Sequence, residues 1–208
     1  MLTAAQIDRE LAAYLPGRIG GLADQILVYI DLLLKWNRKV ALTTVVDPVK
    51  IVRFHFGESL FATQCFSLNK SRLADVGSGA GFPGLPLAMA APQLAVTLIE
   101  SNRKKCAFLE EVIRVLNLPN AEAYRGRAES MAPISPAFEF VTARAFGHFE
   151  KLVSWAKTHL TPDGRVLLWL GEADARAVSS SQGWNWDAPR LIPGSSRRYV
   201  LVGSAIHL

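Results

Sequence analysis

The sequence predicts an α/β fold in which a helical extension, residues 1–70, precedes a doubly wound domain with a parallel sheet, residues 71–208. Two observations predict it. From Arg72 onward short apolar runs alternate with helical segments, and a glycine-rich turn joins the first apolar run to the first of these helices. Before Arg72 only helical patterns occur. With 208 residues, 50% of them apolar and 20% charged, the chain can bury one substantial core.

Three helices are expected in the extension. The first covers residues 4–14 and ends before Pro16, and the third begins after Asp47, an N-cap that is followed by Pro48 in the first helical position. The second is the clearest, because its apolar side chains recur at steps of four and three and form one stripe. This stripe consists of Leu22, Ile26, Tyr29, Leu33, Trp36 and Val40.

Six strands are expected after residue 70, at residues 73–76, 95–99, 121–124, 138–143, 166–170 and 199–203. Helices are expected near residues 83–91 and at residues 103–116. Strands that alternate with helices indicate a parallel sheet covered on both faces, and ligands of such sheets bind beyond the carboxyl ends of the strands. We interpret residues 179–196 as a surface loop anchored by Trp184 and Trp186, with a substrate lid as the alternative.

Composition narrows the class of protein. The N-terminus lacks the pattern of a signal peptide, and no apolar stretch is long enough to span a bilayer, so we expect a cytoplasmic protein with no membrane partner. Cys65 and Cys106 lie on apolar helix faces, which favours buried thiols. The histidines are scattered, so no metal site is expected. The net charge of +5 favours an anionic partner, although proteins that bind no nucleic acid often carry as much.

The glycine-rich turn runs from Asp75 to Gly84 and reads DVGSGAGFPG. Glycines such as Gly77 and Gly79 allow a sharp turn and let a ligand approach the main chain. A plain structural turn is the simplest alternative. Gly79, Gly81 and Gly84 also satisfy the G-x-G-x-x-G pattern of Rossmann-like dinucleotide sites, so NAD or a flavin dinucleotide has to be weighed against S-adenosylmethionine (AdoMet).

Two residues favour AdoMet. Asp75 at the strand end would repel a pyrophosphate but suits the cationic groups of AdoMet. Pro83 removes an N–H at the helix start, where a pyrophosphate binds. Glu100 ends the second strand, nineteen residues after Gly81, and could accept hydrogen bonds from both ribose hydroxyls, which would serve NAD and AdoMet equally. A solvated strand end is the alternative for Glu100.

The chain also resembles a known family between residues 36 and 170. The matching segments are NR at 37–38, LT at 42–43, DP at 47–48, RFH at 53–55, DVGSGAGFPGLPL at 75–87, LIES at 98–101, KK at 104–105, FL at 108–109, RAE at 127–129 and ARAF at 143–146. In these segments it is similar to RsmG, also called glucose-inhibited division protein B, the bacterial family that methylates guanine N7 in small-subunit rRNA.

The resemblance implies a class I AdoMet-dependent methyltransferase fold, AdoMet as the cofactor, and 16S rRNA or the small ribosomal subunit as the partner. It carries the family's AdoMet contacts over to Gly77, Phe82, Ala128, Glu129 and Arg144. Phe82 would cover the ligand with an apolar face, and the Ala128-Glu129 pair would present an N–H and a carboxylate to the adenine.

Arg144 is expected to be the catalytic residue, because it follows the fourth strand at the active-site end. There it could hold the methionine carboxylate, an RNA phosphate or the guanine O6, and a structural salt bridge is the alternative. Guanine N7 carries a free lone pair, so orientation matters more than acid–base chemistry. The sequence departs from the family at Ala41, where Asn is usual, and at Leu170, where Lys is usual, so a role of that Lys in orienting RNA does not carry over.

Basic residues gather near the predicted site, and we expect them to bind RNA. They are Arg103, Lys104, Lys105, Arg127, Arg197 and Arg198. Three of them open a helix, where positive charge opposes the helix dipole, and RNA phosphate would offset that cost. A solvated surface is the alternative. We interpret the chain as a monomeric 16S rRNA guanine-N7 methyltransferase; a methyltransferase of a small molecule or protein and a non-enzymatic RNA-binding protein are the alternatives.

Overall fold

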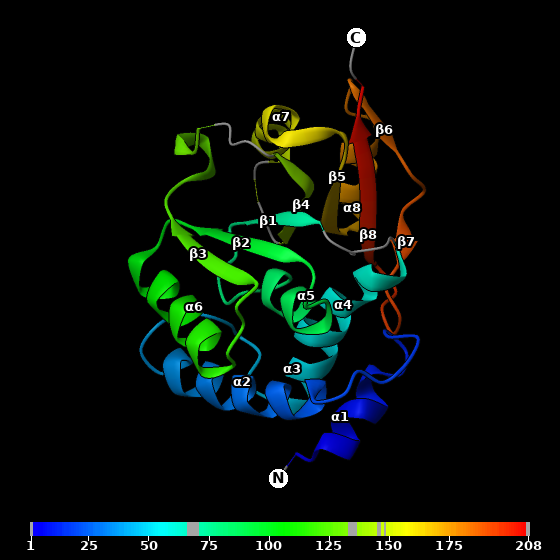
Figure 1. Cartoon of the computed structure of the whole chain (residues 1–208). Coiled ribbons are helices and arrows are strands. Elements are labelled where there is room, and N and C mark those ends of the chain that lie inside the picture. The colour runs from blue at the N-terminus through cyan, green and yellow to red at the C-terminus, as the bar shows by residue number, and fades with distance from the viewer. Residues whose placement is uncertain (1, 66–70, 133–136, 145–146, 148, 207–208) are drawn as a thin grey trace.

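The computed structural model describes residues 2–65, 71–132, 137–144, 147 and 149–206 (Figure 1). Its helices are α1 (Ala4–Leu11), α2 (Leu22–Asn37), α3 (Pro48–Ile51), α4 (Glu58–Leu60), α5 (Gly84–Ala90), α6 (Arg103–Val115), α7 (Phe149–His159) and α8 (Glu172–Ser179). A π-helix, η1 (Val52–Gly57), and two 3₁₀ helices, η2 (Phe61–Gln64) and η3 (Ala128–Ser130), complete the helical segments. The strands are β1 (Arg72–Val76), β2 (Ala95–Glu100), β3 (Ala121–Arg125), β4 (Phe138–Arg144), β5 (Leu160–Gly171), β6 (Trp184–Trp186), β7 (Arg190–Leu191) and β8 (Arg198–Ala205).

The strands form one sheet in the order β3-β2-β1-β4-β5-β8-β6, and β7 pairs with β8. Strands β1 to β5 run parallel, as predicted. β8 runs antiparallel to β5, with Arg198 opposite Gly171, so the expectation of an all-parallel sheet is wrong for the last strand. A short turn at residues 192–197 joins β7 to β8, which accounts for the antiparallel pairing of these two strands. Because Arg198 lies opposite Gly171, β8 begins at the edge of the sheet where β5 ends.

Each face of the sheet has its own hydrophobic layer. Side chains alternate along a strand, so Leu73 and Leu167 belong to one buried cluster while Ala74 and Leu168 belong to the other. The first cluster includes residues of α1, α2, α5 and α6, and the second includes residues of α7 and α8. Figure 1 shows α2, α5 and α6 on one face and α7 on the opposite one. The doubly wound α/β prediction is thereby confirmed.

The expected N-terminal helices are present. Thr3 and Gln6 form a capping box at the start of α1, which ends at Leu11, earlier than predicted. Asp47 caps α3, because its Oδ1 accepts the Lys50 N–H at 2.8 Å. From there α3, η1, α4 and η2 follow one another without a break.

These helices share a core with the sheet. On α2 the predicted stripe is buried at Leu22, Ile26, Tyr29 and Leu33. Its residues belong to the same hydrophobic cluster as Leu98 of β2. Residues of the extension therefore form part of the layer that covers one face of the sheet.

The segment at residues 179–196 is only partly a loop. Trp184 and Trp186 lie on β6, which pairs with β8, and their rings stack with centroids 5.4 Å apart. The prediction of two anchored tryptophans is confirmed, but the surface loop it assumed contains two short strands. Within the described ranges, no helix is both long and apolar enough to cross a membrane.

Candidate functional site

The loop between β1 and α5 places three glycines in the left-handed region, with φ of 71° at Gly77, 56° at Gly79 and 84° at Gly81. The Gly77 N–H donates to the Ile99 carbonyl at 2.9 Å, which holds the start of the loop beside β2. A Cβ at Gly79 would meet only the Gly77 carbonyl oxygen, at 3.8 Å, so the main chain there is open. A Cβ at Gly81 would instead collide with the Tyr29 hydroxyl. The lack of a side chain at Gly79 thus leaves space for a ligand, whereas at Gly81 that space is occupied by the Tyr29 hydroxyl.

Glu100 ends β2 next to this loop and is 7% exposed. Its Oε2 accepts the Gly79 N–H at 2.9 Å, and its Oε1 accepts the Asn102 N–H at 2.7 Å. Each carboxylate oxygen has a second lone pair, so Glu100 can hold both amides and still accept hydrogen bonds from ligand hydroxyls. The side chain is an anchor of the loop and not a solvated strand end.

Asp75 lies differently from what was predicted. Its side chain is fully buried; Oδ1 accepts from the Thr142 hydroxyl at 2.9 Å and Oδ2 from the Gly84 N–H at 3.2 Å. The expectation that it faces the cationic groups of a ligand is therefore corrected: alternation along β1 turns it toward the face that α5 covers. Burial raises the pKa of Asp75 to about 6, against hydrogen bonds from Thr142, Ser78 and Gly84.

The Asp75 carboxyl still helps to distinguish between AdoMet and NAD as the cofactor. It takes up the Gly84 N–H at the first residue of α5. In dinucleotide-binding domains the pyrophosphate uses the corresponding helix N-terminus. A buried acidic group at that place disfavours NAD, as expected from the sequence, although by a different contact.

Phe82 ties the loop to the N-terminal helices. Its ring stacks on Tyr29 at 5.4 Å and on His55 at 4.8 Å between centroids, and it meets the Phe56 ring edge-on at 5.2 Å. Only 8% of Phe82 is exposed. The predicted role as an apolar cover for the ligand is therefore corrected, because most of this side chain is used in packing.

His55 stays uncharged at neutral pH. Burial lowers its pKa to about 4, and the charge of Arg144 contributes to this shift. One ring nitrogen lies 2.7 Å from the Thr43 hydroxyl. The imidazole therefore adds no positive charge beside the loop.

The end of β3 adjoins the end of β2, because the Gly126 N–H donates to the Glu100 carbonyl at 3.0 Å. The 3₁₀ helix η3 follows, with Ala128 buried and Glu129 exposed. The structure thus brings Gly77, Glu100 and the Ala128-Glu129 pair to one edge of the sheet, as predicted.

Arg144 ends β4 within a buried network. Its Nη2 donates to Oε2 of Glu58 at 3.1 Å, and Glu58 is 1% exposed. Nε of Arg198 donates to the other Glu58 oxygen at 2.7 Å, and Nη2 of Arg198 forms an ion pair with that oxygen, also at 2.7 Å. Burial lowers the pKa of Arg144 and raises that of Glu58, and the opposite charges counteract both shifts. The salt-bridge alternative for Arg144 therefore holds for one side of its guanidinium.

The other side of the Arg144 guanidinium has no partner among the described residues. Its Nη1 is buried and finds no hydrogen-bond partner in the part of the chain that the structure describes. A cavity of about 510 Å³ lies here, beyond the ends of β4 and β5, and Trp169, Gly171 and Asp174 are among its lining residues. In the parallel register of β1 and β4, Asp75 lies opposite Thr142. Gly77 and Arg144 follow these two residues by two positions, so both lie at the same edge of the sheet.

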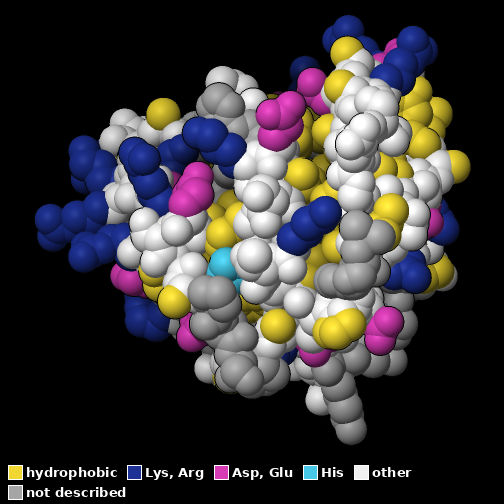
Figure 2. Space-filling view, turned by 90° about the horizontal axis from the view of Figure 1, so that it is seen from above, with side chains coloured by type: hydrophobic (Ala, Val, Ile, Leu, Met, Phe, Trp, Pro, Cys, Tyr) yellow, Lys and Arg dark blue, Asp and Glu magenta, His cyan; other side chains and the backbone are white. Residues whose placement is uncertain are grey.

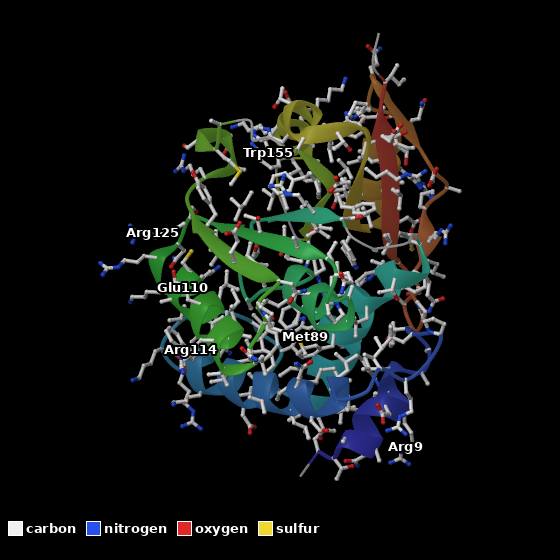
Figure 3. The ribbon with its side chains drawn as sticks, in the orientation of Figure 1. Arg9, Met89, Glu110, Arg114, Arg125 and Trp155 are labelled. Atoms are coloured by element: carbon white, nitrogen blue, oxygen red, sulfur yellow. The ribbon has the colours of Figure 1, made fainter. Side chains whose placement is uncertain are left out.

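The predicted RNA-binding residues fall into two groups. Arg103, Lys104 and Arg127 are exposed, and Lys105 is half-buried. Figure 2 shows Lys and Arg side chains gathered on the side where α6 and β3 lie in Figure 1, and Figure 3 shows Arg125 at the outer edge of the molecule. Asn102 caps α6 by accepting the N–H groups of residues 104 and 105, at 2.9 and 3.2 Å.

The second group lies at the start of β8. Arg197 is exposed. Arg198 is engaged with Glu58, and its guanidinium carbon lies 5.0 Å from the centre of the Phe54 ring. Arg198 was expected to bind RNA; the buried Glu58 carboxylate already engages its guanidinium, while 41% of the side chain is exposed, so the RNA contact stays a prediction.

Three residues at the site were not predicted: Tyr29, His55 and Glu58. Tyr29 belonged to an apolar stripe, and His55 to a matching segment with no assigned role. The sequence did give a sign of Glu58. It lies two residues after Phe56 on an apolar helical run, and a carboxylate that is buried in such a place has to be paired with a cation. Among the residues that the structure describes, no group of three or more His, Cys, Asp or Glu could hold a metal ion.

Comparison with known proteins shows the family of this chain. The family described as rRNA small subunit methyltransferase G has a model that matches residues 23–183. The Ribosomal RNA small subunit methyltransferase G of Stutzerimonas stutzeri is 42% identical over 181 residues, which cover 85% of this chain and 84% of that protein. The protein of the same name from Xanthomonas axonopodis pv. citri is 37% identical over 184 residues, covering 86% and 85%.

Solved structures share the fold. A SAM dependent methyltransferase from Aquifex aeolicus superposes with a TM-score of 0.63 at 15% identity, over 77% of this chain and 94% of that chain. The ribosomal protein L11 methylase from Lactobacillus delbrueckii subsp. bulgaricus gives 0.62 at 14% identity, over 74% and 80%. The fold is that of class I AdoMet-dependent methyltransferases. With the family match over residues 23–183, the chain belongs to the rRNA small subunit methyltransferase G family.

Proposed function

We propose that this protein transfers a methyl group from AdoMet to N7 of a guanine in the 16S rRNA of the small ribosomal subunit. The observation that carries the proposal is the family match over residues 23–183, which contain the glycine loop, Glu100 and Arg144. With a substrate in the small subunit, the reaction would take place in the cytoplasm. The net charge of +5 suits a polyanionic partner.

AdoMet would lie along the open main chain at Gly77 and Gly79, with its ribose hydroxyls on Glu100 and its adenine beside the Ala128-Glu129 pair. The open space at Gly79 and the unused lone pairs of Glu100 support this placement. When bound, AdoMet supplies an electrophilic methyl group, whose bond to sulfur breaks as the lone pair of N7 forms the new bond to carbon.

The residues of the chain then have to orient the guanine and must not place a positive charge beside the cationic sulfur. N7 is unprotonated near neutral pH, so no base has to remove a proton first. Arg144 would donate to the guanine O6 from the edge of the cavity. His55, whose ring stacks on Phe82 of the glycine loop, is neutral and would therefore not repel the positively charged sulfur of bound AdoMet.

The basic residues would bind the RNA backbone. Arg103, Lys104 and Lys105 lie beside the proposed cofactor site, because the Asn102 that caps their helix also donates to Glu100. Together with Arg127 and Arg197 they would contact phosphates and hold the RNA without reading its sequence.

The test is to map the modified base. Small subunits from a strain that lacks this protein are incubated with the purified protein and AdoMet, and the RNA is treated with borohydride and then aniline, which cleave at N7-methylguanine. We expect a single new break in 16S rRNA, and none when AdoMet is omitted. Methylated rRNA that resists cleavage would refute the N7 position, and rRNA that takes up no methyl group would refute the RNA substrate.

A further inference from the structure

Glu58 joins the N-terminal helices to the carboxyl edge of the sheet. It is the first residue of α4, and its two carboxylate oxygens serve two different arginines, Arg144 and Arg198. Its main chain is anchored as well, since the Trp169 indole N–H donates to the Glu58 carbonyl at 2.7 Å. The carboxylate therefore has a defined position and a defined orientation.

In this arrangement Glu58 binds only one of the two amino groups of the Arg144 guanidinium. Nη2 is taken by Glu58, while Nη1 is buried with no partner among the described residues. An unpaired buried donor is costly, and a ligand acceptor would relieve that cost. Arg144 also lines the cavity beyond the ends of β4 and β5.

An arginine that binds guanine normally uses two donors, one on O6 and one on N7. In N7 methylation such a contact would occupy the lone pair that has to attack the methyl group. A productive arginine must therefore reach O6 with one amino group and leave N7 untouched.

We infer that Glu58 is a positioning residue for methyl transfer, which takes up Nη2 of Arg144 so that Nη1 alone donates to the O6 of the target guanine. The inference rests on the proposed function. Arg198 contributes by binding the second oxygen of Glu58, which keeps the carboxylate from turning away from Arg144. The selectivity for N7 then depends on a residue of the N-terminal helices that touches no substrate.

The experiment compares wild type with Glu58→Gln and Glu58→Asp on small subunits from the deletion strain. Glu58→Gln should lower kcat by about 10- to 100-fold, because a guanidinium without its charged partner no longer holds the guanine in line. The dissociation constant of AdoMet, measured by calorimetry, should change by less than about twofold, since in the proposed function Arg144 contacts the guanine and not AdoMet. The described bonds of Glu58 run to Arg144, Arg198 and Trp169 and not to the glycine loop. Glu58→Asp keeps the charge and should recover most of the kcat.

Glu10→Gln is the matched control. Glu10 pairs with Arg53 in the same helical layer, outside the network of Glu58. It should leave kcat unchanged. Wild-type kcat in Glu58→Gln, or an equal decrease in the Gln and Asp variants, would overturn the inference.

If Glu58→Gln fails to fold, Arg198→Gln still tests the inference, because the Arg198 side chain is 41% exposed and its removal is better tolerated. Positioning predicts a lower kcat with little change in KM for the subunit. A higher KM with unchanged kcat would assign Arg198 to the RNA backbone and overturn the coupling. Absence of N7-methylguanine in the wild-type reaction would instead refute the proposed function, which separates the two failures.

Discussion

The hydroxyl of Tyr29, on α2, donates a 2.6 Å hydrogen bond to the carbonyl oxygen of Ala80 inside the glycine loop. Both residues are buried, and burial raises the pKa of the Tyr29 phenol, so the group remains a donor at any physiological pH. The shape of the loop thus depends on a helix that precedes the sheet in the chain.

Tyr29→Phe should therefore weaken both the fold and the cofactor site. It leaves the Ala80 carbonyl buried without its donor, which should lower the free energy of unfolding by about 1–3 kcal/mol. AdoMet should bind more weakly, as calorimetry would show. Tyr14→Phe, which removes a hydroxyl elsewhere in the helical layer, is the control, and equal effects of the two changes would contradict the prediction.

Gly79→Val should abolish measurable AdoMet binding while the fold is retained. Its side chain would enter the open space at the main chain, and the φ of 56° adds strain of about 1–2 kcal/mol. Gly21→Val carries similar strain, at φ of 76°, in open space at the start of α2. Circular dichroism and calorimetry on both variants separate strain from damage to the site; normal AdoMet affinity in a folded Gly79→Val protein would exclude this loop as the cofactor site.

Glu100→Ala should weaken AdoMet binding by about 1.5–3 kcal/mol, the scale of hydrogen bonds to a charged group. The variant also frees the Gly79 and Asn102 amides, so part of the effect would come from a looser loop. Glu122→Ala removes an exposed carboxylate from the neighbouring strand β3, where it accepts a hydrogen bond from Thr97, and should leave the affinity unchanged. An affinity of Glu100→Ala close to that of wild type would mean that the ribose binds elsewhere.

Replacing Arg103, Lys104 and Lys105 together with Ala should flatten the salt dependence of RNA binding. The slope of log K against log salt should fall by up to roughly 0.7 for each single-strand phosphate that the protein no longer neutralises, with AdoMet affinity unchanged. The matched control replaces Lys35, Arg38 and Lys39, three exposed cations near the end of α2. If both triple variants change the slope equally, the net charge of the protein, and not a binding surface at α6, causes the salt dependence.

The buried carboxyl of Asp75 predicts a pH dependence of stability. Its pKa rises from 3.8 to about 6 on folding, so the folded state binds the proton more tightly than the unfolded state. Its contribution to stability is complete below about pH 4 and disappears as the pH rises through 6, by about 3 kcal/mol in total. In denaturant titrations the unfolding free energy of wild type minus that of Asp75→Asn should fall across this range; a difference that rises with pH would show that the pKa is lowered instead.

Local patterns were enough to predict much of this protein. The stripe on α2 and the glycines at positions 77, 79 and 81 depend on residues close in sequence, and both were located correctly. The partners of Glu58 lie 86 and 140 residues away in the chain, and no local pattern relates them. Asp75 shows the same limit. The sequence places a carboxylate at the end of a strand, but it does not show whether a helix covers the face of the sheet to which that side chain points.

The antiparallel direction of β8 has a consequence for synthesis of the chain. Arg198 is the first residue of that last strand, so Glu58 is made long before the second of its two cations. An unfinished chain that ends before β8 has Glu58 paired with Arg144 alone and β5 with an open edge, which can pair with another chain. Synthesis of β8 therefore supplies the second cation of Glu58 and covers the open edge of β5 in one step.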